Sequence, residues 1–153
     1  MIYLGSDHRG FALKEKLKQL LTEWGCDYED VGPFEYNKDD DYPDFATAVA
    51  KAVALSLSNP SKGSDAKGIL ICGSGVGVTV AANKIKGIIA GTMFDVEQVK
   101  ASVSDENANV IGLSSDHSSE EKNIEIVKAF LEAKFSGAER HVRRVAKIHS
   151  LEK

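Results

Sequence analysis

The sequence predicts a single α/β domain, a Rossmann-like three-layer sandwich in which helices cover both faces of a five-stranded parallel sheet. Two observations support this prediction. Short, nearly continuous apolar runs alternate with segments of helical periodicity along the chain, as expected for a buried parallel sheet. The length of 153 residues suits one hydrophobic core, so one domain spanning 1–153 is expected. The polar tract at 56–67 is therefore predicted to be a surface loop rather than a linker.

In the first half of the chain, the apolar run 2–5 predicts a strand that is followed by a polar loop and a helix with a leucine-rich face. Gly25 is expected to end this helix, because glycine readily adopts the left-handed conformation found there. Residues 27–32 predict a second short strand. Pro43 then suits the first turn of another helix.

The second half continues the alternation. A buried strand is predicted at 68–72, where isoleucine and leucine run continuously into a glycine-rich loop. Ser118 and Glu121 have the spacing of a capping box, which predicts the start of the last long helix. The other predicted elements are helices at 76–86, 95–104 and 118–135 and strands at 87–93 and 107–115.

Composition excludes several classes of function. The formal net charge of -4 and the pI near 5.6 do not favour a broad nucleic-acid-binding or membrane-binding surface. No run approaches the roughly 18 apolar residues of a membrane span, and the N-terminus lacks signal-peptide features, so a cytoplasmic location is expected. Cys26 and Cys72 form neither a disulfide framework nor a zinc-type cluster, and no metal site is expected.

The stretch 71–77, ICGSGVG, places a thiol where a buried strand meets three glycines. Backbone N–H groups in such a loop can turn toward an oxyanion or a phosphate. The dinucleotide-binding pattern fails because position 78 is valine, and the Gly-Lys-Ser/Thr of a phosphate loop is missing. Spacing alone leaves two readings of the loop, a binding site or a tight turn. It also leaves Cys72 as either a reactive thiol or an inert core residue.

Two further groups are candidates for a site. Asp7 and His8 follow the first strand, and the carboxyl ends of parallel strands meet at one edge, so this pair and the glycine loop should face one crevice. Acid/base or hydroxyl-binding work suits both side chains, although aspartate is also a common capping residue. Arg140 and Arg144 would share one helical face, where they could converge on a phosphate or form a solvated basic surface.

Four stretches together resemble the type B ribose-5-phosphate isomerases: GSDHRGFALK, DYPDFA, GILICGSGVGVTVAANK and GAERHVRRVAKI. The resemblance runs nearly from end to end. The same superfamily includes the two subunits of galactose-6-phosphate isomerase and some tetrose-phosphate isomerases, all of them aldose–ketose isomerases without a metal or nucleotide cofactor. It therefore implies a phosphorylated sugar as substrate, no cofactor, and a homodimer or homotetramer whose subunits share active sites.

The resemblance also implies a role for each candidate residue. Cys72 would move a proton between C1 and C2 of the open-chain sugar, while Ser74 and the loop amides stabilise the enediolate oxygen. Asp7 and His8 would contact sugar hydroxyls or the ring oxygen, and two arginines would hold the phosphate. The implied substrate-binding positions are Gly73, Gly75, Val76, Gly77, Tyr42, Asn109, Arg140, Arg144 and His141.

Two positions depart from the family pattern. Asp105 stands where most members have the histidine that opens the furanose ring, and Ile89 stands where arginine is usual. The segment NANVIG resembles the galactose-6-phosphate isomerase subunit whose ring-opening histidine comes from its partner. Three hypotheses remain. The chain is a pentose-phosphate isomerase in which Asp105, His8 or Asp7 replaces the histidine, or it isomerises another phosphosugar, or it binds sugar phosphates without catalysis. The retained Cys72, Ser74 and arginine pair favour an enzyme over a binding protein.

Overall fold

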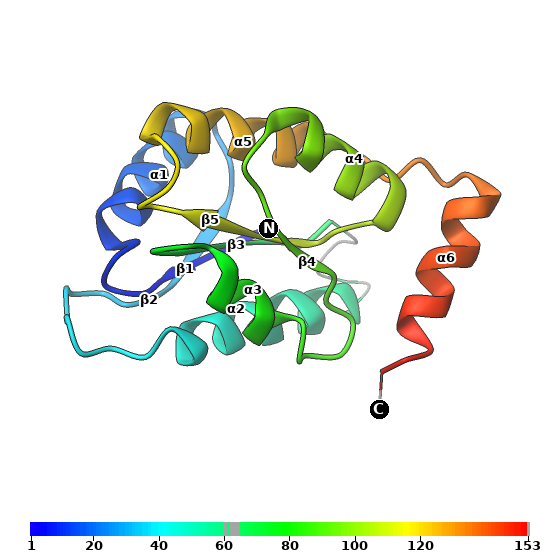
Figure 1. The fold of residues 1–153 in the computed structure, drawn as a ribbon, viewed down its shortest axis with the longest axis horizontal. Coiled ribbons are helices and arrows are strands. Elements are labelled where there is room, and N and C mark those ends of the chain that lie inside the picture. Colours follow the sequence, from blue (N-terminus) through cyan, green and yellow to red (C-terminus); the bar gives the residue numbers. More distant parts are fainter. Residues whose placement is uncertain (60, 62–64, 153) are drawn as a thin grey trace.

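The computed structural model describes residues 1–59, 61 and 65–152, and it confirms the predicted α/β sandwich (Figure 1). The sheet within these residues has five strands, all parallel, in the order β2-β1-β3-β5-β4. The predicted surface loop at 56–67 includes residues 60 and 62–64, which lie outside the described residues. The strands are β1 (Ile2–Ser6), β2 (Tyr28–Gly32), β3 (Lys67–Cys72), β4 (Ala90–Thr92) and β5 (Val110–Ser114).

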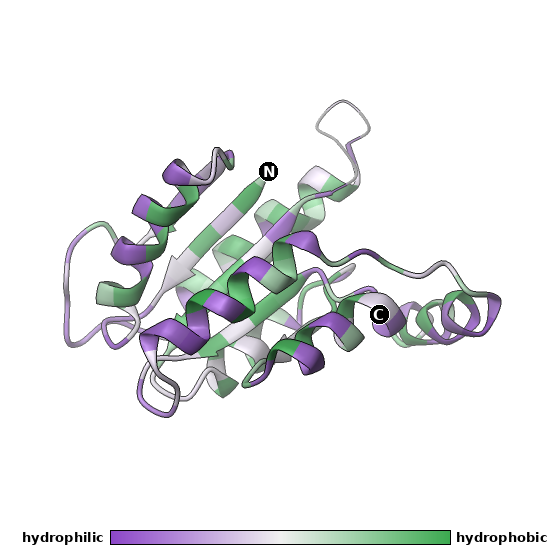
Figure 2. Ribbon diagram, turned by 90° about the horizontal axis from the view of Figure 1, so that it is seen from above, coloured by the Kyte–Doolittle hydropathy of each residue, from purple (hydrophilic) through white to green (hydrophobic). Residues whose placement is uncertain are grey.

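Helices cover both faces of the sheet, with α1, α4 and α5 on one side and α2 and α3 on the other (Figure 1). The last helix, α6, extends away from the body of the molecule beyond α4. Figure 2 shows strands that are mostly hydrophobic and helices that carry hydrophilic residues. The helices are α1 (Phe11–Glu23), α2 (Tyr42–Leu57), α3 (Val76–Ala82), α4 (Val96–Glu106), α5 (Glu120–Glu132) and α6 (Glu139–His149).

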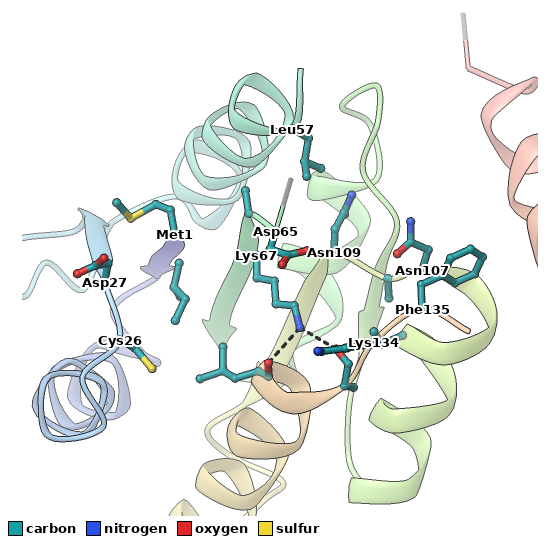
Figure 3. Close-up of a pocket in the computed structure, with 16 residues that line it drawn as sticks. Met1, Cys26, Asp27, Leu57, Asp65, Lys67, Asn107, Asn109, Lys134 and Phe135 are labelled. Atoms are coloured by element: carbon teal, nitrogen blue, oxygen red, sulfur yellow. Dashed lines mark hydrogen bonds between the residues drawn. The ribbon is translucent and has the colours of Figure 1, made fainter. Parts of the chain in front are cut away.

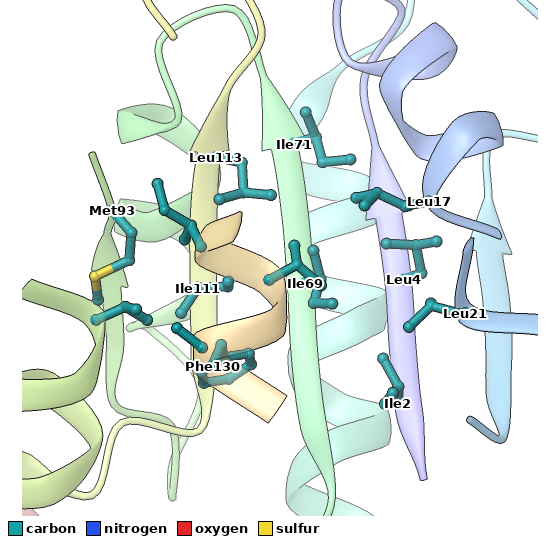
Figure 4. Packing of buried hydrophobic residues seen from close by; sticks show 14 of the residues in the cluster. Ile2, Leu4, Leu17, Leu21, Ile69, Ile71, Met93, Ile111, Leu113 and Phe130 are labelled. Carbon is teal, nitrogen blue, oxygen red and sulfur yellow. The ribbon is translucent and has the colours of Figure 1, made fainter. Parts of the chain in front are cut away.

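Side-chain alternation along β3 divides the core into two layers. Ile69 and Ile71 point toward α1, α4 and α5, together with the residues drawn in Figure 4. Leu70 and Cys72 point the other way, into the apolar cluster beneath α2 and α3. The thiol of Cys72 is thus placed at the carboxyl end of a central strand, on the face that α2 and α3 cover.

The sequence predicted the end of α1 correctly but misplaced the start of α5. Gly25, which follows the C-cap residue Trp24 of α1, has a φ of +70°, as the sequence predicts. The predicted capping box is wrong by one residue: the cap of α5 is Ser119, whose Oγ accepts the Lys122 N–H at 3.2 Å. The helix therefore starts too late for Ser118 and Glu121 to cap it.

The fourth strand is shorter than predicted, and α3 ends before residue 86. The Asn109 side chain accepts the Ile89 N–H at 3.0 Å and donates to the Gly87 carbonyl at 2.8 Å. The Asn83 side chain likewise exchanges two hydrogen bonds of 2.8 Å with the Ala90 backbone. Side-chain amides thus satisfy backbone groups that a strand partner would otherwise satisfy, and the chain between α3 and β4 remains a loop.

Candidate active site

A cavity of about 330 Å³ opens at the carboxyl ends of the strands, where the polar loops were expected to meet. Its walls come from the loops after β1, β3 and β5 and from the starts of α2 and α3. Six of the predicted site residues are brought together here. The lining residues are Asp7, Arg9, Tyr42, Cys72, Gly73, Ser74, Gly77, Asp116 and His117.

Cys72 is both a core residue and part of the cavity wall. Its side chain packs in the apolar cluster under α2 and α3, and only 4% of the residue is exposed. The sulfur nevertheless accepts a hydrogen bond of 3.1 Å from the Gly75 N–H. This hydrogen bond joins the thiol to the glycine loop at the wall of the cavity.

A steric constraint explains why each of the three positions in the loop is glycine. Gly75 adopts a φ of +76° at the start of α3, a conformation that side chains disfavour. A Cβ at Gly73 would lie 2.7 Å from the Asp116 Oδ2 atom, and one at Gly77 would lie 2.8 Å from the Tyr42 ring. The absence of side chains here lets the opposite wall of the cavity approach the backbone.

Asp7 forms a turn and lines the cavity. One carboxylate oxygen, Oδ1, accepts the Arg9 N–H at 2.9 Å and the Gly10 N–H at 3.0 Å. Burial raises the pKa of this carboxyl above its ordinary value, although the Gly10 hydrogen bond, the nearby His8 and the Arg9 hydrogen bond act in the opposite direction. The side chain is therefore a structural turn residue whose proton affinity has been increased.

The His8 ring is oriented by a contact with Asp40. Its Nδ1 atom lies 2.7 Å from Asp40 Oδ1, and its backbone N–H donates to the same oxygen at 3.0 Å. The residue is not among those that line the cavity. Asp40, which no sequence motif indicated, thus fixes the orientation of this imidazole.

Three lining residues were missed from the sequence: Arg9, Asp116 and His117. Arg9 and Asp116 form an ion pair that passes over Gly73. Asp116 and His117 lie in the loop after β5, separated by Ser115 from its last residue Ser114, much as Asp7 and His8 follow the first strand. This second Asp-His pair after a strand was the signal that could have identified them.

The remaining predicted residues lie elsewhere within the single chain. His141 is buried against α4, with its Nδ1 2.7 Å from the Ser136 Oγ and 3.6 Å from an Asp105 oxygen. Arg140 and Arg144 are exposed on α6. Asn109 holds the loop before β4. One chain therefore does not bring these positions to the cavity that Cys72 lines.

A larger hollow of about 620 Å³ lies at the opposite, amino-terminal edge of the sheet (Figure 3). Its most conspicuous polar group, Lys67, donates to the Phe130 carbonyl at 2.6 Å and to the Ala133 carbonyl at 3.1 Å. Burial lowers the pKa of this lysine. Its ammonium group completes the end of α5, so we place the reactive site in the smaller cavity.

Two further observations concern the described residues. They contain no group of three or more histidine, cysteine, aspartate or glutamate side chains that could hold a metal ion. Within the same part of the chain, no helix has the length and apolar character needed to cross a membrane. The cavity as described offers a thiol, carboxylates, an imidazole and backbone amides.

Comparisons with known proteins agree with the fold and with the sequence motifs. The family described as Ribose/Galactose Isomerase matches residues 2–148. The probable ribose-5-phosphate isomerase B of Mycoplasma genitalium is 42% identical over 153 residues, which cover 99% of this chain and 95% of that protein. A putative sugar phosphate isomerase of Bacillus subtilis is 32% identical over 151 residues, covering 99% and 96%.

Solved structures show the same similarity. Ribose-5-phosphate isomerase B from Mycoplasma genitalium with bound ribulose-5-phosphate superposes with a TM-score of 0.90 at 40% identity, covering 98% of this chain and 94% of that one. The Clostridium thermocellum enzyme gives a TM-score of 0.88 at 35% identity, covering 98% and 95%. The resemblance drawn from the sequence motifs is confirmed, and the chain belongs to the ribose/galactose isomerase family.

Proposed function

We propose that this protein is an aldose–ketose isomerase that interconverts ribose 5-phosphate and ribulose 5-phosphate. The observation that carries the proposal is the sulfur of Cys72, which is buried, lines the cavity and accepts the Gly75 N–H at 3.1 Å. Relatives at 42% identity bear the name of this enzyme, and a similar structure holds ribulose-5-phosphate. Membership of the family and this cavity together support the assignment.

In the proposed reaction, the Cys72 thiolate removes the proton from C2 of the open-chain aldose. The electron pair of the C–H bond forms the C1–C2 double bond, and the carbonyl electrons move to O1, which gives an enediolate. The Ser74 hydroxyl and the amides of the glycine loop donate hydrogen bonds to this oxygen, because stabilising developing charge lowers the barrier most effectively. The proton of the C2 hydroxyl then passes to O1, carried by Ser74 or water, as the C2=O bond forms. The electrons of the C1–C2 double bond take the proton back from the thiol at C1, which yields the ketose.

The substrate phosphate requires more positive charge than the cavity of one chain provides. Its single lining guanidinium, Arg9, is already paired with Asp116. We therefore propose a homodimer in which the α6 helix of a second copy brings Arg140 and Arg144 to the cavity rim. Exposed apolar side chains near the rim, Tyr42 and Val76, suit contact with a second copy.

A second candidate is a phosphosugar other than a pentose phosphate, such as galactose 6-phosphate or a tetrose phosphate. Position 105 carries a carboxylate that faces His141 rather than the cavity, so the position that opens the ring in most of the family offers no imidazole here. A substrate that is already open, such as a tetrose phosphate, would not need that step. Turnover assays with the three sugar phosphates distinguish the candidates.

The test of the proposal is Cys72→Ala, with Cys26→Ala as the matched control because Cys26 lies outside the site cavity. Loss of a proton-transfer group should lower turnover of ribose 5-phosphate by at least about 10²-fold, while the dissociation constant of the sugar phosphate measured by calorimetry stays the same. The control variant should keep wild-type turnover. Activity of Cys72→Ala near the wild-type level would remove this thiol from the reaction and contradict the proposal.

A further inference from the structure

An isomerase of ribose 5-phosphate faces a second chemical task besides moving the carbon-bound proton. In water this sugar exists mainly as a cyclic hemiacetal, whereas only the open aldehyde has an acidic proton at C2. Opening the ring requires a proton for the ring oxygen and a base for the C1 hydroxyl, a task for general acid–base groups. The inference below rests on the proposed function and concerns which residue performs this step.

His117 is the one imidazole among the residues that line the Cys72 cavity. The chain has four histidines. His8 is turned toward Asp40, and His141 is buried against α4. His149 contacts Glu152 at the end of α6. The His117 ring makes no hydrogen bond or ion pair within residues 1–59, 61 and 65–152, so its nitrogen atoms are available to a ligand.

Hydrogen bonds connect the backbone around His117 to the glycine loop. The Asp116 N–H donates to the Gly73 carbonyl at 3.0 Å, and the buried Ser114 hydroxyl donates to the same carbonyl at 2.7 Å. The His117 N–H donates to the Ser114 oxygen at 2.9 Å. These bonds fix the position of the His117 backbone relative to the glycine loop, while the residue itself is exposed.

Asp7 lines the same cavity from the loop after β1. Its Oδ1 is engaged by two backbone N–H groups, and the carboxyl group has a second oxygen for a substrate hydroxyl. An acid from the loop after β5 and a base from the loop after β1 thus border one cavity. Such a pair can act on the two oxygens of a hemiacetal carbon at the same time.

We propose that His117 opens the ring form of the substrate. The protonated imidazole gives its proton to the ring oxygen O4, and the C1–O4 bond breaks with its electron pair passing to that oxygen. The Asp7 carboxylate takes the proton of the C1 hydroxyl as the C1=O double bond forms. Net proton count is unchanged, and both side chains return to their starting states by exchange with water. The thiol then acts on the open aldehyde.

The test uses the difference between the two sugars. Ribulose 5-phosphate cannot close a five-membered ring because its O5 carries the phosphate, so it reaches Cys72 without ring opening. His117→Gln keeps hydrogen-bonding groups but cannot transfer a proton. In this variant the velocity from ribose 5-phosphate should stop rising with enzyme concentration, because uncatalysed opening supplies the aldehyde at a fixed rate. The wild-type velocity should stay proportional to enzyme over the same range.

A second measurement isolates the thiol step. Deuterium from solvent should enter C1 of ribulose 5-phosphate with His117→Gln at a rate within about threefold of wild type, since this exchange needs no ring chemistry. His149→Gln, which replaces an imidazole outside the cavity, is the matched control and should behave as wild type in both assays. Circular dichroism should show that both variants are folded.

The outcomes separate the two proposals. If wild type acts on neither pentose phosphate, the proposed function fails and this inference fails with it. If wild type is active and the His117→Gln velocity from ribose 5-phosphate stays proportional to enzyme, only the role of His117 is overturned. Loss of deuterium exchange in His117→Gln would also overturn it, because the residue would then act in the thiol step.

Discussion

Asp7 shows how one residue can serve the fold and the cavity at once. Its Oδ1 organises the turn between β1 and α1 through two backbone N–H groups, and burial beside the cavity raises its pKa. The raised pKa means that the folded protein binds a proton here more tightly than the unfolded chain does. The free energy that this group contributes to folding therefore falls as pH rises from below 3.8 through the raised pKa.

Asp7→Asn removes this titration while keeping an oxygen that accepts both N–H groups. We expect the unfolding free energy of the variant, relative to wild type, to increase as pH rises from below 3.8 to neutrality. Urea unfolding followed by circular dichroism at several pH values measures the difference. Asp7→Ala is the control that loses both hydrogen bonds, and it should be destabilised at every pH. A relative stability of Asp7→Asn that falls with pH would contradict this account.

The sequence identified the residues that follow β1 and β3 but not those that follow β5. Cys72 and Asp7 were found because Cys72 ends a predicted strand and Asp7 lies in the loop that follows one. Asp116 and His117 also follow a strand, but the loop before α5 gave no glycine pattern to draw attention to it. The orientation of His8 could not be predicted, because it depends on Asp40, 32 residues away in sequence.

At the scale of elements, strands and helices were predicted well where the apolar periodicity is continuous. They were predicted less well where side chains, rather than other backbone groups, hydrogen-bond the backbone. The end of α5 is such a place. No glycine follows its last residue, and its C-cap, Ala133, has an extended conformation. Lys67, at the start of β3, donates to three carbonyls at this end: Phe130, Leu131 and Ala133. A lysine from the sheet thus does what a glycine cap usually does.

Lys67→Met should therefore destabilise the protein although it preserves the aliphatic stem. Hydrogen bonds from a charged donor contribute about 1.5–3 kcal/mol, so we expect the unfolding free energy at neutral pH to fall by about 2–3 kcal/mol. Lys128→Met is the matched control, because the ammonium group of that exposed lysine lies 5.0 Å from the Trp24 ring centroid and donates no hydrogen bond within residues 1–59, 61 and 65–152. Urea unfolding compares the two. Equal losses in both variants would show that the α5 carbonyls do not depend on Lys67.

At the scale of the whole molecule, the residue proposed to react with the sugar and the residues proposed to bind its phosphate lie far apart within one chain. The cavity with Cys72 lies at the carboxyl edge of the sheet, whereas α6, with Arg140 and Arg144, extends from the body (Figure 1). Within α6 only His141 and Val145 are buried, and Val142 and Ile148 are exposed. A helix with so little of its surface covered by its own chain suits an arrangement in which it packs on a second copy.

Mixing two inactive variants tests this arrangement directly. Cys72→Ala leaves the arginines intact, and the Arg140→Ala, Arg144→Ala double variant leaves the thiol intact. If each site takes its thiol from one subunit and its arginines from the other, every hybrid dimer contains one complete site. Random exchange makes half of the dimers hybrid, so the mixture should recover about a quarter of the wild-type turnover of ribose 5-phosphate. The control mixes Cys72→Ala with a variant that carries all three substitutions, Cys72→Ala, Arg140→Ala and Arg144→Ala. No dimer in this mixture contains a complete site, so it should show no recovery.

Two results would contradict the shared site. If each site lies within one subunit, neither mixture recovers activity. Elution of the wild-type protein as a monomer in size-exclusion chromatography would contradict the arrangement independently.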